Sequence, residues 1–176
     1  WRRGFIALFT TLLLLPSSVF SNLSAPWAAQ NIHDQQGQMA VLVQQYLHAP
    51  VAINDLGLVA RGNPLPVLDL AGLGTPGAFE RRREAPYNSD WIQTLMREHN
   101  THFAMIYDSW FPYWPAAFHP VAVLNMPGML LGPSSRRVSL YADSEPAAEQ
   151  LLRAVRAYQA EHPDKADWFW IHRSLP

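Results

Sequence analysis

The stretch of residues 50–76 constrains the fold most, because it contains two short apolar runs that each lead to an acidic residue. Residues 51–53 precede Asp55, and residues 67–68 precede Asp69. Short apolar runs without alternation, bounded by turn residues, are typical of strands that are covered on both faces. The pattern therefore predicts two neighbouring strands of an α/β sheet, with both carboxylates at strand ends, where such sheets tend to bind ligands.

A third acid follows the same rule. The apolar run 102–107 predicts a central strand, and Asp108 comes directly after it, followed by a loop dense in aromatic residues. We therefore expect Asp55, Asp69 and Asp108 to line one edge of the sheet. Each aspartate has a second interpretation, in which it caps a turn or a helix by accepting backbone hydrogen bonds. An independent hydrolase would require the three carboxylates to converge on one pocket.

Composition narrows the function further. Of the 176 residues, 49% are hydrophobic, which is enough for the core of one domain. The net charge of −1 gives no electrostatic reason to expect a nucleic-acid partner, and the lack of cysteine excludes thiol chemistry. Dinucleotide, P-loop, zinc-protease and serine-hydrolase motifs do not occur. The sequence therefore predicts no catalytic residue, no metal site and no cofactor.

The chain begins with a hydrophobic segment. Arg2 and Arg3 precede an uncharged apolar run over residues 4–20, which as a helix spans roughly 26 Å, close to the ~30 Å of a hydrocarbon core. We interpret residues 1–21 as a transmembrane helix; a signal peptide or signal-anchor and a buried core helix are the alternatives. Either membrane interpretation places residues 35–176 outside the cytoplasm, with residues 22–34 as a linker.

The rest of the chain alternates helical and extended patterns. Apolar faces predict helices over residues 35–47, over residues 90–98 and after Ser144. Apolar runs at 121–124 and 129–131 flank a turn, residues 137–142 alternate as in an edge strand, and residues 168–172 predict a last short strand. The predicted fold is a three-layer α/β domain with a small mixed sheet and flanking helices, preceded by one transmembrane helix.

Two surface features have more than one interpretation. The basic run of Arg81, Arg82 and Arg83 suits a solvated loop or helix end, or a site for a lipid phosphate or headgroup. Trp110 and Trp114 suit hydrophobic packing, insertion at a membrane interface, or stacking on a sugar or lipid. Both features become ligand candidates if the domain lies close to a membrane.

Two short acidic motifs, one after each of the first two predicted strands, occur in the same order in a known family. Residues 30–114 resemble the C-terminal extracytoplasmic domain of bacterial polytopic membrane glycosyltransferases of the GT-C superfamily. In that domain a strand ends in Asp-(Ile/Leu)-Gly, matched here by Asp55-Leu56-Gly57. A second strand ends in Asp-Leu-(Ala/Val)-Gly-Leu, matched by residues 69–73. The likeness follows a matching membrane segment, and the chain departs from the family after Phe118.

The resemblance implies an accessory domain on the periplasmic side of the cytoplasmic membrane. Such enzymes use polyprenyl-phosphate-linked sugars, and their catalytic carboxylates belong to a first extracytoplasmic loop that this chain does not contain. The expected partners are membrane lipid, the rest of the same membrane protein, the donor lipid and a glycan acceptor. The alternative is a non-enzymatic periplasmic binding or interaction module, tethered or secreted. Candidate ligand-facing residues are Asp55, Asp69, Asp108, Trp110 and Trp114, and candidate headgroup residues are Arg81, Arg82 and Arg83.

Overall fold

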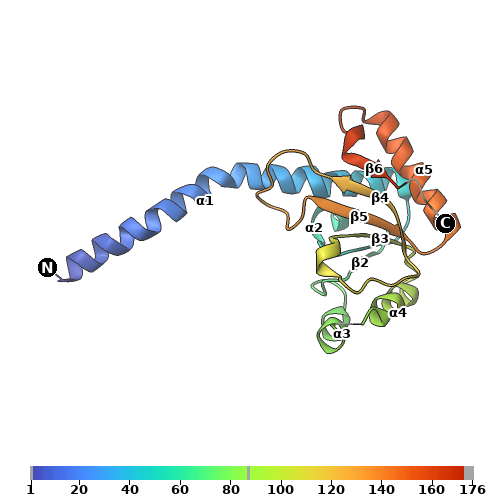
Figure 1. Cartoon of the computed structure of the whole chain (residues 1–176), viewed down its shortest axis with the longest axis horizontal. Helices are drawn as coiled ribbons and strands as arrows, with labels where there is room; N and C mark the ends of the chain where they lie inside the picture. The colour runs from blue at the N-terminus through green and yellow to red at the C-terminus, as the bar shows by residue number, and fades with distance from the viewer. Residues whose placement is uncertain (1, 87, 173–176) are drawn as a thin grey trace.

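A computed structural model describes residues 2–86 and 88–172, without the side chains of residues 5, 7, 8 and 11–18. The chain forms one long helix that projects from an α/β body (Figure 1). This helix, α1 (Arg2–Val41), continues directly into one π-helical segment, η1 (Leu42–Leu47). The predicted helix over residues 35–47 is thus the last part of a much longer one.

The body is built on a six-stranded sheet with the order β2-β1-β3-β5-β4-β6. The first three strands are parallel, and Ile53 lies opposite both Asp69 and Met105. The other pairings are antiparallel. The predicted mixed sheet, in which the strands of residues 51–53 and 67–69 are neighbours, is therefore confirmed, and the structure shows in addition that these two strands are parallel. The strands are β1 (Val51–Ile53), β2 (Val67–Asp69), β3 (Phe103–Ile106), β4 (His119–Asn125), β5 (Arg137–Ala142) and β6 (Phe169–Ile171).

Helices cover the sheet on both faces, which makes three layers (Figure 1). The C-terminal part of α1, η1 and α5 (Glu145–Glu161) bury one apolar cluster with the sheet. On the other face, α3 (Ala78–Glu84) and α4 (Asp90–Glu98) bury a second cluster. Three short elements complete the chain: α2 (Gly57–Ala60) and the 3₁₀ turns η2 (Asp108–Trp110) and η3 (Ala166–Trp168).

One strand prediction needs correction. Residues 137–142, predicted as an edge strand, form β5 in the interior of the sheet, because β4 pairs with its second side and β6 then forms the edge. The burial of Val138, Ser139 and Leu140 in succession fits this interior position. The apolar run 129–131, predicted beside the turn, lies in the loop between β4 and β5.

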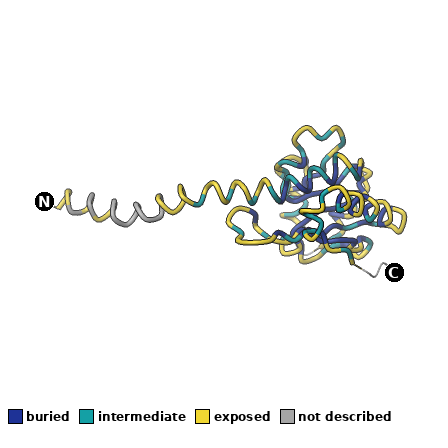
Figure 2. The backbone as a smooth tube through the Cα atoms, turned by 90° about the horizontal axis from the view of Figure 1, so that it is seen from above, coloured by how far each residue is buried: buried dark blue, intermediate teal, exposed yellow. Residues whose placement is uncertain are grey.

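The projecting half of α1 stands apart from the body (Figure 2). Residues 22–34, predicted as a linker, are helical, so the connection to the body is a continuous helix. Among the side chains that the structure describes, no helix is both long and apolar enough to cross a membrane. The structure therefore does not support the predicted transmembrane helix, although residues 11–18 of that segment lie outside those side chains.

Buried glutamines fix α1 to the body. The Tyr107 hydroxyl donates to Gln35 Oε1 at 2.6 Å, and the Tyr158 hydroxyl donates to Gln38 Oε1. Between them, Gln36 Oε1 accepts from Leu58 N at 2.9 Å. All three glutamines are buried, where a missing partner would cost about 1–3 kcal/mol. These contacts orient the helix relative to the sheet.

Tyr158 gives a first prediction. Burial, together with the charge of Asp164, raises the pKa of Tyr158 to about 12 from about 10 in the unfolded chain. The unfolded state therefore loses this proton first, so the stability due to neutral Tyr158 is complete below about pH 10 and is lost as the pH rises toward about 12. Tyr158→Phe should show a shallower loss of unfolding free energy in this interval, measured by urea unfolding at several pH values. Equal slopes for the two proteins would contradict the prediction.

Candidate functional site

The C-terminal ends of the three parallel strands form the edge that we call the acid rim: Asp55, Asp69 and Asp108. Asp69 is the last residue of β2, and Asp55 and Asp108 follow β1 and β3 by two residues. Because the strands are parallel and paired in register, these three residues lie at one edge of the sheet, as predicted.

Asp69 is engaged by its own turn. Its Oδ1 accepts from Ala71 N at 2.8 Å, and its Oδ2 accepts from Leu73 N at 2.5 Å and Gly74 N at 2.7 Å. Its own N–H donates to Thr75 Oγ1 at 2.7 Å. The side chain is 1% exposed. This is the turn-capping arrangement that the sequence also suggested, and it fixes the shape of the rim at this point.

Asp108 is engaged across the sheet. Ser139 Oγ donates to its Oδ2 at 2.7 Å, and the Tyr141 hydroxyl donates to its Oδ1 at 2.9 Å. Burial, followed by the charge of Asp108, raises the pKa of Tyr141, so this tyrosine remains the donor. Asp108 thus connects the end of β3 to β5.

Asp55 is the least engaged of the three acids. The Tyr107 hydroxyl lies 3.5 Å from Asp55 Oδ2 and gives its proton to Gln35 at the shorter distance. Burial and then the charge of Asp55 raise the pKa of Tyr107, which keeps the hydroxyl protonated. Asp108 is more exposed than Asp55, but its carboxylate already accepts two short hydrogen bonds. Asp55 is partly exposed and has only the long contact with Tyr107 among the described residues, so its carboxylate has the most acceptor capacity left for a ligand.

Two buried side-chain amides at this edge, those of Asn54 and Gln35, were not predicted as site residues from the sequence. Asn54 Oδ1 accepts from Tyr107 N at 2.8 Å, and its Nδ2 is buried without a partner among the residues that the structure describes. Gln35 approaches the rim from α1, 72 positions away from Tyr107 in the chain. A polar residue at an otherwise apolar helix face is the signal that indicates such a role, and Gln35 and Gln38 show it.

The aromatic candidates are packed beside the rim. Trp110 meets the Tyr107 ring edge-on at 5.7 Å between centroids. Trp114 contacts the rings of Phe111, Phe118 and Tyr141 at centroid distances of 5.0–6.0 Å. These contacts are those of hydrophobic packing, the first of the three interpretations of this loop.

The three arginines do not form one cluster. Arg81 pairs with Glu98 at 3.0 Å, and the Arg82 guanidinium lies over the rings of Trp110 and Phe111 at 5.8 and 5.4 Å from their centroids. Arg83 is exposed. A single anion would therefore meet these side chains from different directions.

Two of the hollows on the body lie beside the sheet. One, of about 300 Å³, lies along the turn after Asp69, between Gly72 and the start of α3. The other, of about 350 Å³, brings the exposed indole of Trp170 and the imidazole of His172 together with the guanidinium of Arg137 from β5, and no local motif predicts such a combination. It is lined by Val123, Asn125, Arg137, Trp170, Ile171 and His172.

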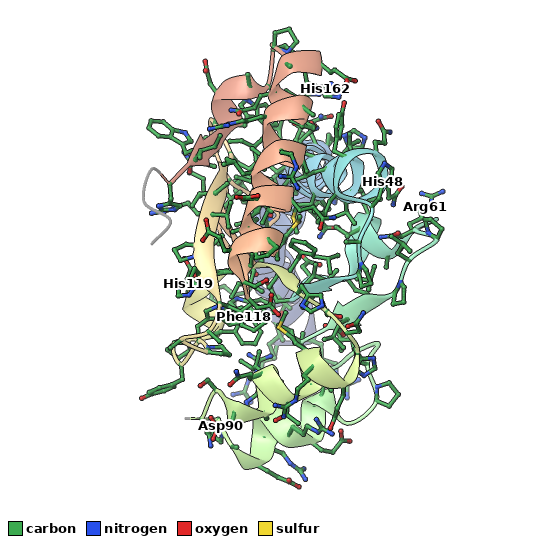
Figure 3. The ribbon with its side chains drawn as sticks, turned by 90° about the vertical axis from the view of Figure 1, so that its right-hand side faces the viewer. His48, Arg61, Asp90, Phe118, His119 and His162 are labelled. Carbon is green, nitrogen blue, oxygen red and sulfur yellow. The ribbon has the colours of Figure 1, made fainter. Side chains whose placement is uncertain are left out.

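The opposite edge of the sheet carries most of the histidines. Figure 3 looks at the body from the side away from the free end of α1, and His48 and His119 are labelled there. His102 precedes β3 at this edge, and its Nδ1 lies 2.7 Å from Asp143 Oδ2. Within the described part of the chain, no group of three or more histidines or acids is placed to hold a metal ion.

Comparison with known proteins assigns a family. The family model described as Domain of unknown function (DUF8728) matches residues 30–141. The chain belongs to this family. The DUF8728 match begins on α1 before Gln35 and ends in β5, so it includes the acid rim and the loop between β4 and β5. No curated protein and no solved structure matches the chain.

Proposed function

We propose that this chain is the extracytoplasmic accessory domain of a membrane glycosyltransferase that uses a polyprenyl-phosphate-linked sugar, with α1 as its attachment to the membrane. One observation carries the proposal: the acid rim and the projecting helix point the same way. Gln35 contacts Tyr107 at the rim. The N-terminal part of α1 projects away from the body (Figure 2). If the projecting part of α1 lies in a membrane, the acid rim faces that membrane.

The two acidic motifs that resemble GT-C enzymes both lie on this rim. Asp69 holds its turn, and Asp108 joins two strands, so these two acids shape the surface. Asp55, with Tyr107 beside it, is the acid that meets a sugar hydroxyl of the donor or of the glycan acceptor. The catalytic carboxylates come from another part of the enzyme, and the domain lies on the periplasmic side of the cytoplasmic membrane.

Topology gives the first test. The chain has no cysteine, so Arg97→Cys on the exposed end of α4 provides a single labelling site far from the rim. In intact bacterial cells whose outer membrane has been removed, we expect a membrane-impermeant maleimide to label this cysteine. The protein itself should sediment with the membranes and resist carbonate extraction. Labelling only after permeabilisation would place the domain in the cytoplasm and refute the proposal.

Binding of the donor lipid gives the second test. The chain is reconstituted in lipid nanodiscs with a photoactivatable polyprenyl phosphate, and the cross-linked peptides are identified by mass spectrometry. We expect labelling at the acid rim that excess unlabelled polyprenyl phosphate competes away, and loss of that labelling in Asp55→Asn. Asp90→Asn, on the exposed start of α4, is the matched control. Labelling that is not competed would favour a binding module unrelated to glycosyl transfer.

A further inference from the structure

The loop between β4 and β5, residues 126–136, exposes apolar side chains. Met129 is 74% exposed and Leu131 is 36% exposed, and no charged residue occurs before Arg136. Surface loops that contact only water are normally polar, and clustered exposed apolar residues mark an interaction surface. The exposed Met129 and Leu131 therefore mark this loop as a candidate interaction surface.

The same loop is fixed against α1. Leu131 N donates to Asn31 Oδ1 at 2.9 Å, and Gln35 Nε2 donates to Ser135 O at 2.8 Å. The backbones also approach closely, because a Cβ atom at Gly132 would lie 2.6 Å from the carbonyl oxygen of Ala28. In Figure 1 the loop that connects β4 to β5 extends from the body beside α1, on the side of its free end. The loop thus forms a ledge beside the helix.

The exposed apolar surface continues along the helix. Phe20, Leu23 and Trp27 are each about two-thirds exposed, and no Asp, Glu, Lys or Arg occurs between Gly4 and Ile32. From Gly4 to Trp27 the helix spans roughly 36 Å, the length of a hydrocarbon core and part of the headgroup layer. A bilayer around this segment would end at the level of the ledge.

Positive charge occurs where the β4–β5 loop joins β5. Arg136 is the last residue of the loop and Arg137 the first of β5, and Arg136 Nη1 donates to Met126 O at 3.2 Å. Along the helix axis the order is an uncharged segment, then a tryptophan with apolar loop residues, then arginines. This order matches the sequence of environments from hydrocarbon through the interface to the phosphates of anionic lipids.

We propose that the β4–β5 loop is a second membrane anchor, which inserts Met129 and Leu131 into the headgroup layer of an anionic bilayer. Arg136 and Arg137 then lie at the level of the lipid phosphates. The inference rests on the proposed function in placing α1 in the bilayer. It adds that the loop fixes how far the acid rim stands from the membrane surface.

Depth-dependent quenching tests this anchor in the full chain. Single-cysteine variants Met129→Cys, Leu23→Cys and Arg97→Cys are labelled with an environment-sensitive fluorophore and reconstituted in vesicles of phosphatidylcholine and phosphatidylglycerol. Nitroxide-labelled lipids then quench any probe in the bilayer. We expect a blue shift and a loss of emission at positions 23 and 129, and neither at position 97.

The outcomes separate the two proposals. Quenching at position 23 without quenching at position 129 would overturn the loop anchor and leave the membrane attachment of α1 intact. Absence of quenching at both positions would overturn both. A blue shift at position 129 that depends on protein concentration and not on lipid would show that the loop meets a second copy of the chain, which also overturns the anchor. Because Met129 is exposed, its replacement should leave the fold unchanged.

Discussion

Replacing Asp69 with alanine should destabilise the domain by about 3–5 kcal/mol. The buried carboxylate accepts from three partly buried backbone N–H groups, and a hydrogen bond to a charged group contributes about 1.5–3 kcal/mol. Water can replace part of this contribution in the variant, because Leu73 and Gly74 are exposed. The turn over residues 70–75 would also lose the contact that positions it beside β2. Urea unfolding followed by far-UV circular dichroism measures the change in unfolding free energy.

Asp55→Ala is the matched control for this substitution. It removes an acid from the same rim, but its one contact with Tyr107 is long, at 3.5 Å. We expect a change within about 1 kcal/mol, typical of a surface substitution that breaks no buried network. If Asp69→Ala costs no more than Asp55→Ala, the carboxylate does not hold the turn, and a ligand role for Asp69 becomes the better interpretation.

Gly72→Ala should be the second large effect, at about 2–4 kcal/mol. Gly72 has φ +92°, and a Cβ atom there would lie 2.5 Å from the backbone N of Phe79. Backbone atoms cannot rotate away, so either the turn or the start of α3 must shift, and strain adds to lost packing. Thermal and urea unfolding of the variant measure the cost.

Gly62→Ala is the control that separates the backbone strain of a positive φ from the steric clash of the added Cβ atom. Gly62 also has a positive φ, of 70°, but a Cβ atom there meets nothing within 4 Å. We therefore expect only the conformational cost of about 1 kcal/mol. The difference between the two variants reports the close approach of the turn to α3. Equal costs would mean that the turn moves freely away from the helix.

The sequence predicted the parallel core of the sheet because that core has a local signature. Residues buried on both faces give unbroken apolar runs, and the acids after β1, β2 and β3 must share an edge once those strands are parallel. The position of β5 had no such signature. Arg137–Ala142 alternates as an edge strand does, and only the pairing with β4, a tertiary choice, places it inside the sheet.

The hydrogen-bond partners of most site residues could not be predicted from the sequence either. Asp69 satisfies its own turn, which local spacing can suggest, whereas Asp108 depends on Ser139 and Tyr141 across the sheet. The buried glutamines bind tyrosines 72 and 120 positions away. Contacts between residues so far apart in the chain produce no periodic pattern in the sequence. For the same reason, only the structure shows that Asp55 has the fewest hydrogen bonds of the three acids.

The unbroken passage of α1 into the body has a mechanical consequence. From Arg2 to Leu47 the backbone stays helical, and the buried glutamines Gln35 and Gln38 fix it to the end of β3 and to α5. No flexible linker therefore separates the domain from the end of α1, so a tilt of that end of the helix is passed on to the sheet. A small change in the tilt of the helix would therefore displace the three carboxylates of the acid rim together, because all three are carried by the same sheet.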